Sequence, residues 1–196
     1  MLFNRSKDVP TEISGVGMSD WYSALNDQNK VKLGRYISGN RTSSKPLFCI
    51  DVMRKANADE NPSVTVMIGE YIEKETTGMC RYHINEELIP ALFELKKYDE
   101  CLQCCDEGLN LFDSFRDEII GRNNGEIPER VLCRNYTINV LIGIYSEYDK
   151  ADAALERFLE MGLISEEDMN YRKQSHKIRK LQRVFDGIYA VKLKNQ

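Results

Sequence analysis

The sequence is short of the residues and patterns that mark turn-rich, secreted or membrane-spanning proteins. It has only 12 glycines and 5 prolines among 196 residues. A chain with many tight turns would need more of both, so helices joined by short loops are favoured. No stretch approaches the roughly 18 uninterrupted apolar residues of a membrane span. Met1 to Val9 is not followed by an apolar run, so we expect no secretory signal. These absences predict a cytoplasmic protein that does not contact a membrane.

Recognisable catalytic patterns are also missing. The sequence has only two histidines, His83 and His176, which leaves little material for a nucleophile–base pair with a third, orienting group. The Gly121–Gly125 segment lacks the Lys-Ser/Thr that would follow a phosphate-binding loop. The carboxylates Glu86-Glu87 and Glu166-Glu167 are typical of first-turn acids that face the positive end of a helix. We therefore predict that the protein is not an enzyme, and the sequence indicates no cofactor.

The charges are unevenly distributed. The whole chain has 27 basic and 31 acidic residues, a net charge of −4. Residues 171–196 carry eight Lys or Arg and one acid, so this tail is +7 and the preceding 170 residues are −11. Such a split indicates either a basic surface that binds a partner or a tail that docks on its own acidic body.

Hydrophobic periodicity and capping signals predict an all-α fold of about eight helices, stacked as antiparallel pairs. No pair of segments is typical of a β-hairpin. Residues 1–18 show no clear period and are interpreted as a flexible N-terminal arm, and residues 19–196 as a single helical-repeat domain. Pro90 lies either near the first turn of a helix capped by Asn85 or at a kink. The expected helices cover residues 21–37, 46–58, 62–74, 82–96, 98–120, 128–147, 149–161 and 166–189.

An internal repeat links two parts of the chain. Residues 88–109 align without gaps to residues 138–159, and Tyr98-Asp99 matches Tyr148-Asp149. Each copy reads as an apolar helix, a tight turn with Tyr-Asp, and a helix that opens with small residues. We predict that both tyrosines are largely buried and that the small residues lie where the two helices of each copy cross closely. These small residues are Cys101 and Ala151.

This pattern resembles the tetratricopeptide repeat, in which two helices meet at a tyrosine with a small residue shortly after it. The likeness covers about residues 82–161. The family's glycine before the tyrosine is Lys96 in one copy and Ser146 in the other, its Leu-Gly pair is absent, and the period is 50 rather than about 34. The resemblance implies a superhelix of helix pairs that binds a protein or peptide partner. It assigns no groove residue.

The C-terminal helix carries the candidate binding residues Arg172, His176, Arg179 and Arg183. Spacings of four, three and four place them in one stripe, with Lys173 and Lys180 beside it. We expect this stripe to face water or an acidic partner. The opposite face should cap the helical stack, as end helices of repeat arrays do. Its apolar residues are Ile178, Leu181, Val184, Phe185 and Ile188.

Two residue pairs raise the question of zinc. Cys80-x-x-His83 and Cys101-x-x-Cys104 have the ligand types and spacing of a zinc site. However, Cys101 and Cys104 occupy small-residue positions of the repeat, where buried thiols are ordinary packing groups. Without a secretory signal, all six cysteines are expected to be reduced. No metal ligand is therefore assigned.

Three hypotheses follow from the sequence. The leading one is a non-catalytic adaptor that binds a protein partner. The second is a nucleic-acid-associated regulator that uses the basic C-terminal helix, although no aromatic side chain interleaves with the stripe. The third is a small structural-zinc protein.

Overall fold

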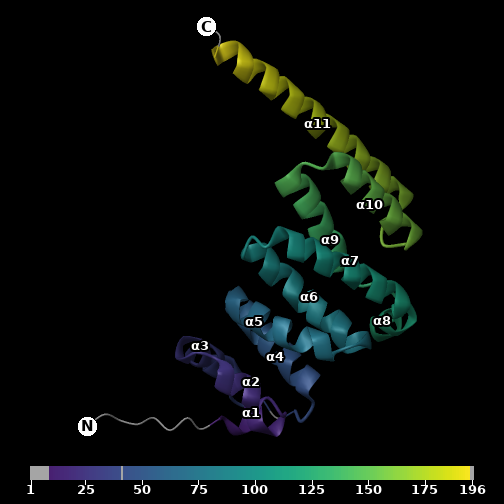
Figure 1. Ribbon diagram of the computed structural model, residues 1–196. Coiled ribbons are helices and arrows are strands. Elements are labelled where there is room, and N and C mark those ends of the chain that lie inside the picture. Colours follow the sequence, from purple (N-terminus) through teal and green to yellow (C-terminus); the bar gives the residue numbers. More distant parts are fainter. Residues whose placement is uncertain (1–8, 41, 195–196) are drawn as a thin grey trace. The chain divides into compact units, whose positions relative to one another are not determined.

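The protein is all-α. The computed structural model describes residues 9–40 and 42–194, with side chains up to Phe185. Within this part of the chain there is no strand, and 78% of the structure is helical, which confirms the predicted fold class (Figure 1).

The chain divides into two compact units rather than the predicted single domain. The N-terminal unit comprises residues 1–115 and the C-terminal unit residues 116–196. The described helices of the N-terminal unit are α1 (Thr11–Gly15), α2 (Ser19–Ala24), α3 (Asp27–Ile37), α4 (Lys45–Ala58), α5 (Pro62–Ile72), a 3₁₀ turn (Glu73–Glu75), α6 (Gly78–Glu94) and α7 (Tyr98–Ser114).

Helices α4 to α7 form the core of the N-terminal unit, and each packs on the next along the chain. Phe48, Ile68, Ile84 and Phe112, one from each helix, are fully buried. Short connections between long helices make neighbouring helices antiparallel. The starts of α4 and α5 agree with the prediction, since Pro46 and Pro62 lie in their first turns.

The first described residues are packed, which corrects the prediction of a flexible arm over residues 1–18. Ile13 and Met18 are buried, and the thiol of Cys49 lies 3.7 Å from the Met18 sulfur. Residues 1–8 lie outside the described residues. The helix predicted over residues 21–37 is broken before Asn26, whose side chain accepts a hydrogen bond from the Asn29 amide at 2.8 Å and caps α3.

Helix α6 begins at Gly78, earlier than predicted. Asn85 is completely buried inside it and is not a cap, and Pro90 also lies in the helix interior. The helix begins about three turns before Pro90. The alternative that placed Pro90 near the first turn, with Asn85 as the cap, is therefore wrong.

The C-terminal unit is built from helices and one π-helical segment. The helix predicted from residue 128 begins at Leu132 and changes to i→i+5 hydrogen bonding at Asn139. The described elements are α8 (Arg116–Arg122), α9 (Leu132–Ile138), the π-helix (Asn139–Tyr145), α10 (Tyr148–Glu160) and α11 (Glu166–Lys194).

The two turns that the internal sequence alignment pairs share one backbone feature. Lys96 and Ser146 both adopt a left-handed conformation, with φ of 60° and 58°. Glycine tolerates this conformation best, and neither turn has one at this position. Cys101 and Ala151 are fully buried, as predicted. The prediction for the tyrosines is only partly right, because Tyr98 and Tyr148 are half-buried.

Candidate functional site

The candidate site lies on α11, which follows α10 after a short turn. Gly162 has a φ of 64°, and the Leu163 amide donates to the Phe158 carbonyl at 2.8 Å, so α10 ends at a left-handed glycine. Ser165 then caps α11 by accepting a hydrogen bond from the Asp168 amide at 3.1 Å. Arg134 donates to the Leu163 carbonyl at 2.6 Å and fixes the turn. The start of α11 is therefore well defined.

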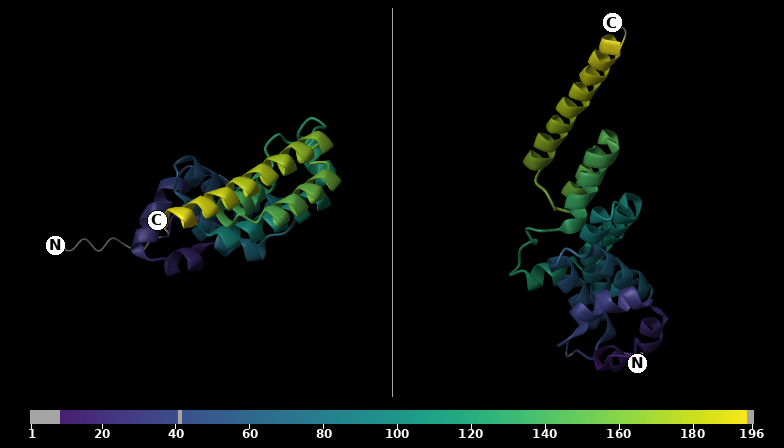
Figure 2. Two further views of the ribbon diagram at one scale, coloured as in Figure 1. Left: turned by 90° about the horizontal axis from the view of Figure 1, so that it is seen from above. Right: turned by 90° about the vertical axis from the view of Figure 1, so that its left-hand side faces the viewer.

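The two helices run side by side and are joined by three polar contacts, which we call the polar row (Figure 2). The row pairs Asp149, Asp152 and Glu156 of α10 with Lys180, His176 and Lys173 of α11. The nitrogen–oxygen distances are 2.9, 2.8 and 2.6 Å respectively. Each set of three spans seven residues, or about two turns, so an antiparallel pair brings the two ends of the row opposite each other, with a step of three on one helix facing a step of four on the other.

His176 is at the centre of this row. Its side chain is buried, with 6% of the residue exposed, and its Nδ1 faces Asp152 Oδ1. The ring of Tyr148 packs beside the imidazole, with centroids 6.3 Å apart. The predicted role of His176 in a solvent-facing stripe is therefore wrong. It joins α11 to α10.

The other predicted stripe residues are divided in their roles. Arg172 makes an ion pair one turn back along its own helix, with Asp168 at 2.9 Å. Arg179 and Arg183 are exposed, as predicted. Lys173 and Lys180, which were expected only to lie beside the stripe, contact α10 instead. Docking of the basic tail on an acidic part of its own chain is thus seen within the C-terminal unit.

The apolar face of α11 is exposed, which corrects the expectation that it caps the stack. Ile178, Leu181, Val184 and Phe185 are 55–59% exposed, and Tyr171 is 71% exposed. The side chain of Ile188 lies outside the described residues. At about 100° per residue, Ile178 and Phe185 point away from His176 and hence from α10. We call Tyr171, Ile178, Leu181 and Phe185 the outer face.

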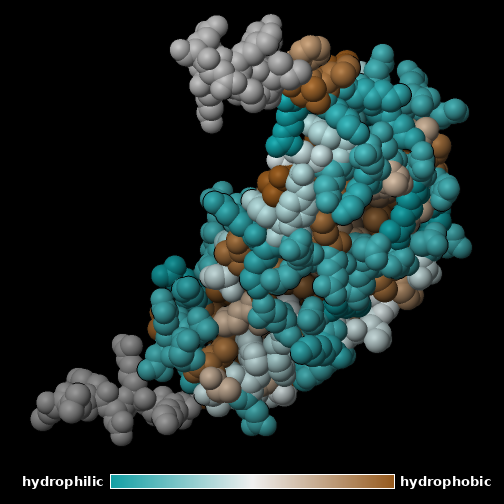
Figure 3. Space-filling view, turned by 45° about the horizontal axis from the view of Figure 1, so that its top comes forward, coloured by the Kyte–Doolittle hydropathy of each residue, from teal (hydrophilic) through white to brown (hydrophobic). Residues whose placement is uncertain are grey.

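Apolar side chains are visible on the surface of α11. Figure 3 shows a cluster of them on the last part of α11 whose side chains are described. No acidic residue occurs from Met169 to Phe185, whereas this segment contains six Lys or Arg. An exposed apolar stripe in a basic helix is typical of helices that bind another surface.

The acidic partners on α10 were not predicted from the sequence. A signal for them was present, because Asp149, Asp152 and Glu156 span seven residues, as Lys173, His176 and Lys180 do. Acidic and basic sets of equal span on consecutive helices favour pairing of those two faces. The apolar stripe of α11 instead indicated that its apolar face would be the buried one.

The pairs considered for zinc do not form a metal site. In the part of the chain that the structure describes, no three His, Cys, Asp or Glu side chains are placed to hold a metal ion. Cys101 and Cys104 are buried, and their thiols donate to the Ile89 and Asn85 carbonyls at 3.5 and 3.8 Å. Burial raises the pKa of the Cys104 thiol, so it is held as a neutral packing group.

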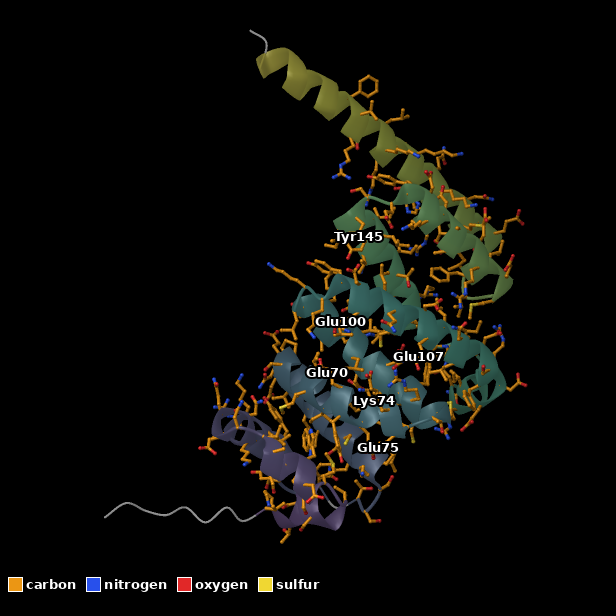
Figure 4. The ribbon with its side chains drawn as sticks, viewed as in Figure 1. Glu70, Lys74, Glu75, Glu100, Glu107 and Tyr145 are labelled. Carbon is orange, nitrogen blue, oxygen red and sulfur yellow. The ribbon has the colours of Figure 1, made fainter. Side chains whose placement is uncertain are left out.

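A cavity of about 150 Å³ lies in the N-terminal unit, among α5, α6 and α7. Glu70 of α5 lines one side of it, and Glu100 and Glu107 of α7 the other (Figure 4). Glu73 of the 3₁₀ turn also lines the cavity. Two cations bridge these sides. Lys97 contacts Glu70 and Glu100 at 3.3 and 3.0 Å, and Arg81 contacts Glu73 and Glu107 at 3.4 and 2.5 Å.

The four glutamates that line the cavity are thus already paired with Lys97 or Arg81. A single cation reaches both sides at each bridge, so the opening is too narrow for a helix to lie in it. The Arg81 guanidinium, followed by the Asn85 amide, lowers the pKa of the Glu107 carboxyl. The arrangement braces α5, α6 and α7 against one another.

Comparison with protein-family models, curated proteins and solved structures gave no significant match. Among the described residues, no helix combines the length and apolar character needed to cross a lipid bilayer.

Proposed function

We propose that this protein is a non-catalytic interaction module that binds a protein partner through the outer face of α11. The observation that carries the proposal is the exposure of Ile178, Leu181 and Phe185 on a helix whose opposite face is already docked on α10. Leaving three large apolar side chains in water is unfavourable by roughly 1.5–3 kcal/mol each relative to full burial. A partner that covers them gains much of this free energy.

The two similar turns at Lys96 and Ser146 support the adaptor character of the proposal, since repeated helix pairs are common in scaffolding proteins. All six cysteines are free thiols, which is in keeping with a reducing compartment. A cytoplasmic location is therefore part of the proposal.

The test is capture of partners from a native lysate by full-length protein, followed by mass spectrometry. The test variant is Leu181→Gln with Phe185→Gln, because glutamine keeps helix propensity while removing the apolar surface. The matched control is Val31→Gln with Leu47→Gln, two comparably exposed apolar residues of the N-terminal unit. We expect the wild type and the control to retain the same protein, and the test variant to lose it. Equal capture by all three contradicts the proposal.

Nucleic-acid binding is the second candidate, favoured by the six basic residues between Met169 and Phe185. It predicts a different result in the same experiment. Nuclease treatment would then remove the captured material, and the Leu181→Gln, Phe185→Gln variant would bind as the wild type does. Three of the six basic residues already pair with acids of the C-terminal unit, which favours the protein partner.

A further inference from the structure

We infer that the outer face of α11 docks an acidic amphipathic helix of its partner. This inference rests on the proposed function and narrows the partner to one chemical class. Tyr171, Ile178 and Phe185 are seven residues apart, and Leu181 lies between the last two. A seven-residue apolar repeat is the pattern by which one helix packs along another.

The charges beside this stripe favour a partner helix of the opposite charge. Arg172, Lys173 and Lys180 pair with acids of their own unit, and Lys177, Arg179 and Arg183 are the remaining basic residues before Phe185. All three are exposed. Lys177 and Arg179 adjoin Ile178 in sequence, so they lie about 100° to either side of it around the helix. A helix seated on Ile178 therefore meets positive charge along both of its edges.

Carboxylates along the edges of the partner helix would complement this charge, as oppositely charged residues do beside the seam of helix pairs. A second copy of α11 would instead bring another Lys177 and Arg179 to the interface, on a helix that has no acid between Met169 and Phe185. Like charges at close range oppose association. The occupant with the best electrostatic match is thus an acidic helix from another protein.

The experiment measures binding of two synthetic peptides to the full-length protein by fluorescence anisotropy. Each peptide has about three heptads with leucine at the first and fourth positions. One has glutamate at the positions beside the leucines, and the other has lysine there. We expect the glutamate peptide to bind at least about tenfold more tightly than the lysine peptide, and to weaken as salt rises from about 0.1 M to about 1 M.

Two variants separate the parts of the surface. Leu181→Gln with Phe185→Gln should lose at least about tenfold in affinity for the glutamate peptide. Lys177→Gln with Arg179→Gln should also weaken binding and should reduce its salt dependence. Circular dichroism and thermal unfolding of both variants check that the fold is retained.

Several results would overturn the inference. Equal affinity for the two peptides, or no binding of the glutamate peptide, excludes an acidic helix as the occupant. A dimer in sedimentation velocity that the Leu181→Gln, Phe185→Gln variant abolishes assigns the face to a second copy. Binding to phosphatidylserine vesicles that the same variant abolishes assigns it to a lipid surface. If the glutamate peptide does not bind but capture from the lysate still depends on Leu181 and Phe185, the inference is wrong and the proposed function stands.

Discussion

Gly69 lies where α5 packs closely against Leu88 of α6. A methyl group added there would lie 2.3 Å from the Cδ2 atom of Leu88, which is buried. Alanine gains up to about 1 kcal/mol in helix propensity over glycine. Overpacking costs about 1–3 kcal/mol, so we expect Gly69→Ala to lower the free energy of unfolding. Urea denaturation measures the change.

Two comparisons isolate this contact. In a Leu88→Ala background the clash is absent, so adding Gly69→Ala should be neutral or stabilising by up to about 1 kcal/mol. Gly34 in α3 is the matched control, because a methyl group there meets no described atom within 4 Å. If Gly69→Ala stabilises the protein as much as Gly34→Ala does, the close approach of α5 and α6 is wrong.

Glu107 should make the stability of the protein depend on pH. Its pKa is lowered chiefly by the hydrogen bond from Arg81, so the folded state favours the carboxylate. The resulting stabilisation is present above the ordinary glutamate pKa of about 4.3, and is lost as pH falls through the lower pKa of the folded state. Glu107→Gln should therefore destabilise the protein near neutrality, and the difference should shrink as pH falls below the ordinary glutamate pKa of about 4.3.

Urea denaturation over a pH series checks this expectation. Glu94→Gln serves as the control, since Glu94 is an exposed residue of α6. A Glu107→Gln effect that is constant from neutral to acidic pH would show that the Arg81 contact does not depend on the charge of the carboxyl group.

At the scale of elements, the polar row predicts unequal effects of its three acids. Asp152 is the partner of the buried His176, so Asp152→Ala leaves a buried imidazole nitrogen without its hydrogen bond, at a cost of about 1–3 kcal/mol. Asp149 and Glu156 pair with lysines near the surface, and their alanine variants should change stability by less than about 1 kcal/mol. Hydrogen exchange of the amides between Lys173 and Lys180, together with urea denaturation, measures both effects.

The predicted basic stripe provides the control for this test. Replacing Arg172, Arg179 and Arg183 together by Gln should leave stability within about 1 kcal/mol, because these side chains are exposed and Arg172 pairs with Asp168 of its own helix. A larger loss for the arginine variant than for Asp152→Ala would mean that α11 is held to its unit mainly by the stripe.

The behaviour of α11 also shows where sequence reasoning succeeded and failed. The helix and its beginning at residue 166 were predicted, because they depend on residues close in sequence, such as the cap Ser165 and the left-handed Gly162. Periodicity also grouped Ile178, Leu181 and Phe185 on one face. It could not tell which face would be covered, since that depends on the acids that α10 presents.

Two further differences between the predicted and the observed helices arise within single segments of the chain. The break before Asn26 was missed because the apolar stripe from Trp21 to Ile37 continues across it, although Asn26 is a good cap. The π-helix from Asn139 to Tyr145 has the same apolar sequence that an α-helix would have. The pattern of hydrophobic residues in this segment does not distinguish the two hydrogen-bonding schemes.

At the scale of the whole molecule, the division at Phe115 predicts that the N-terminal unit folds by itself. Its core is made from its own helices, with Phe48, Met53, Ile84 and Phe112 fully buried. A fragment of residues 1–115 should be helical by circular dichroism and should unfold cooperatively in urea. A fragment with no cooperative transition would show that this unit needs the rest of the chain.

The unequal lengths of α10 and α11 have a mechanical consequence. The last contact of the polar row is at Lys180, opposite the beginning of α10, whereas α11 continues to Lys194 (Figure 2). At 1.5 Å per residue, the remaining 14 residues form a lever arm of about 21 Å. A rotation of about 5° at the polar row moves its end by about 2 Å. The contact between His176 and Asp152 thus limits how far the end of α11 can swing relative to α10.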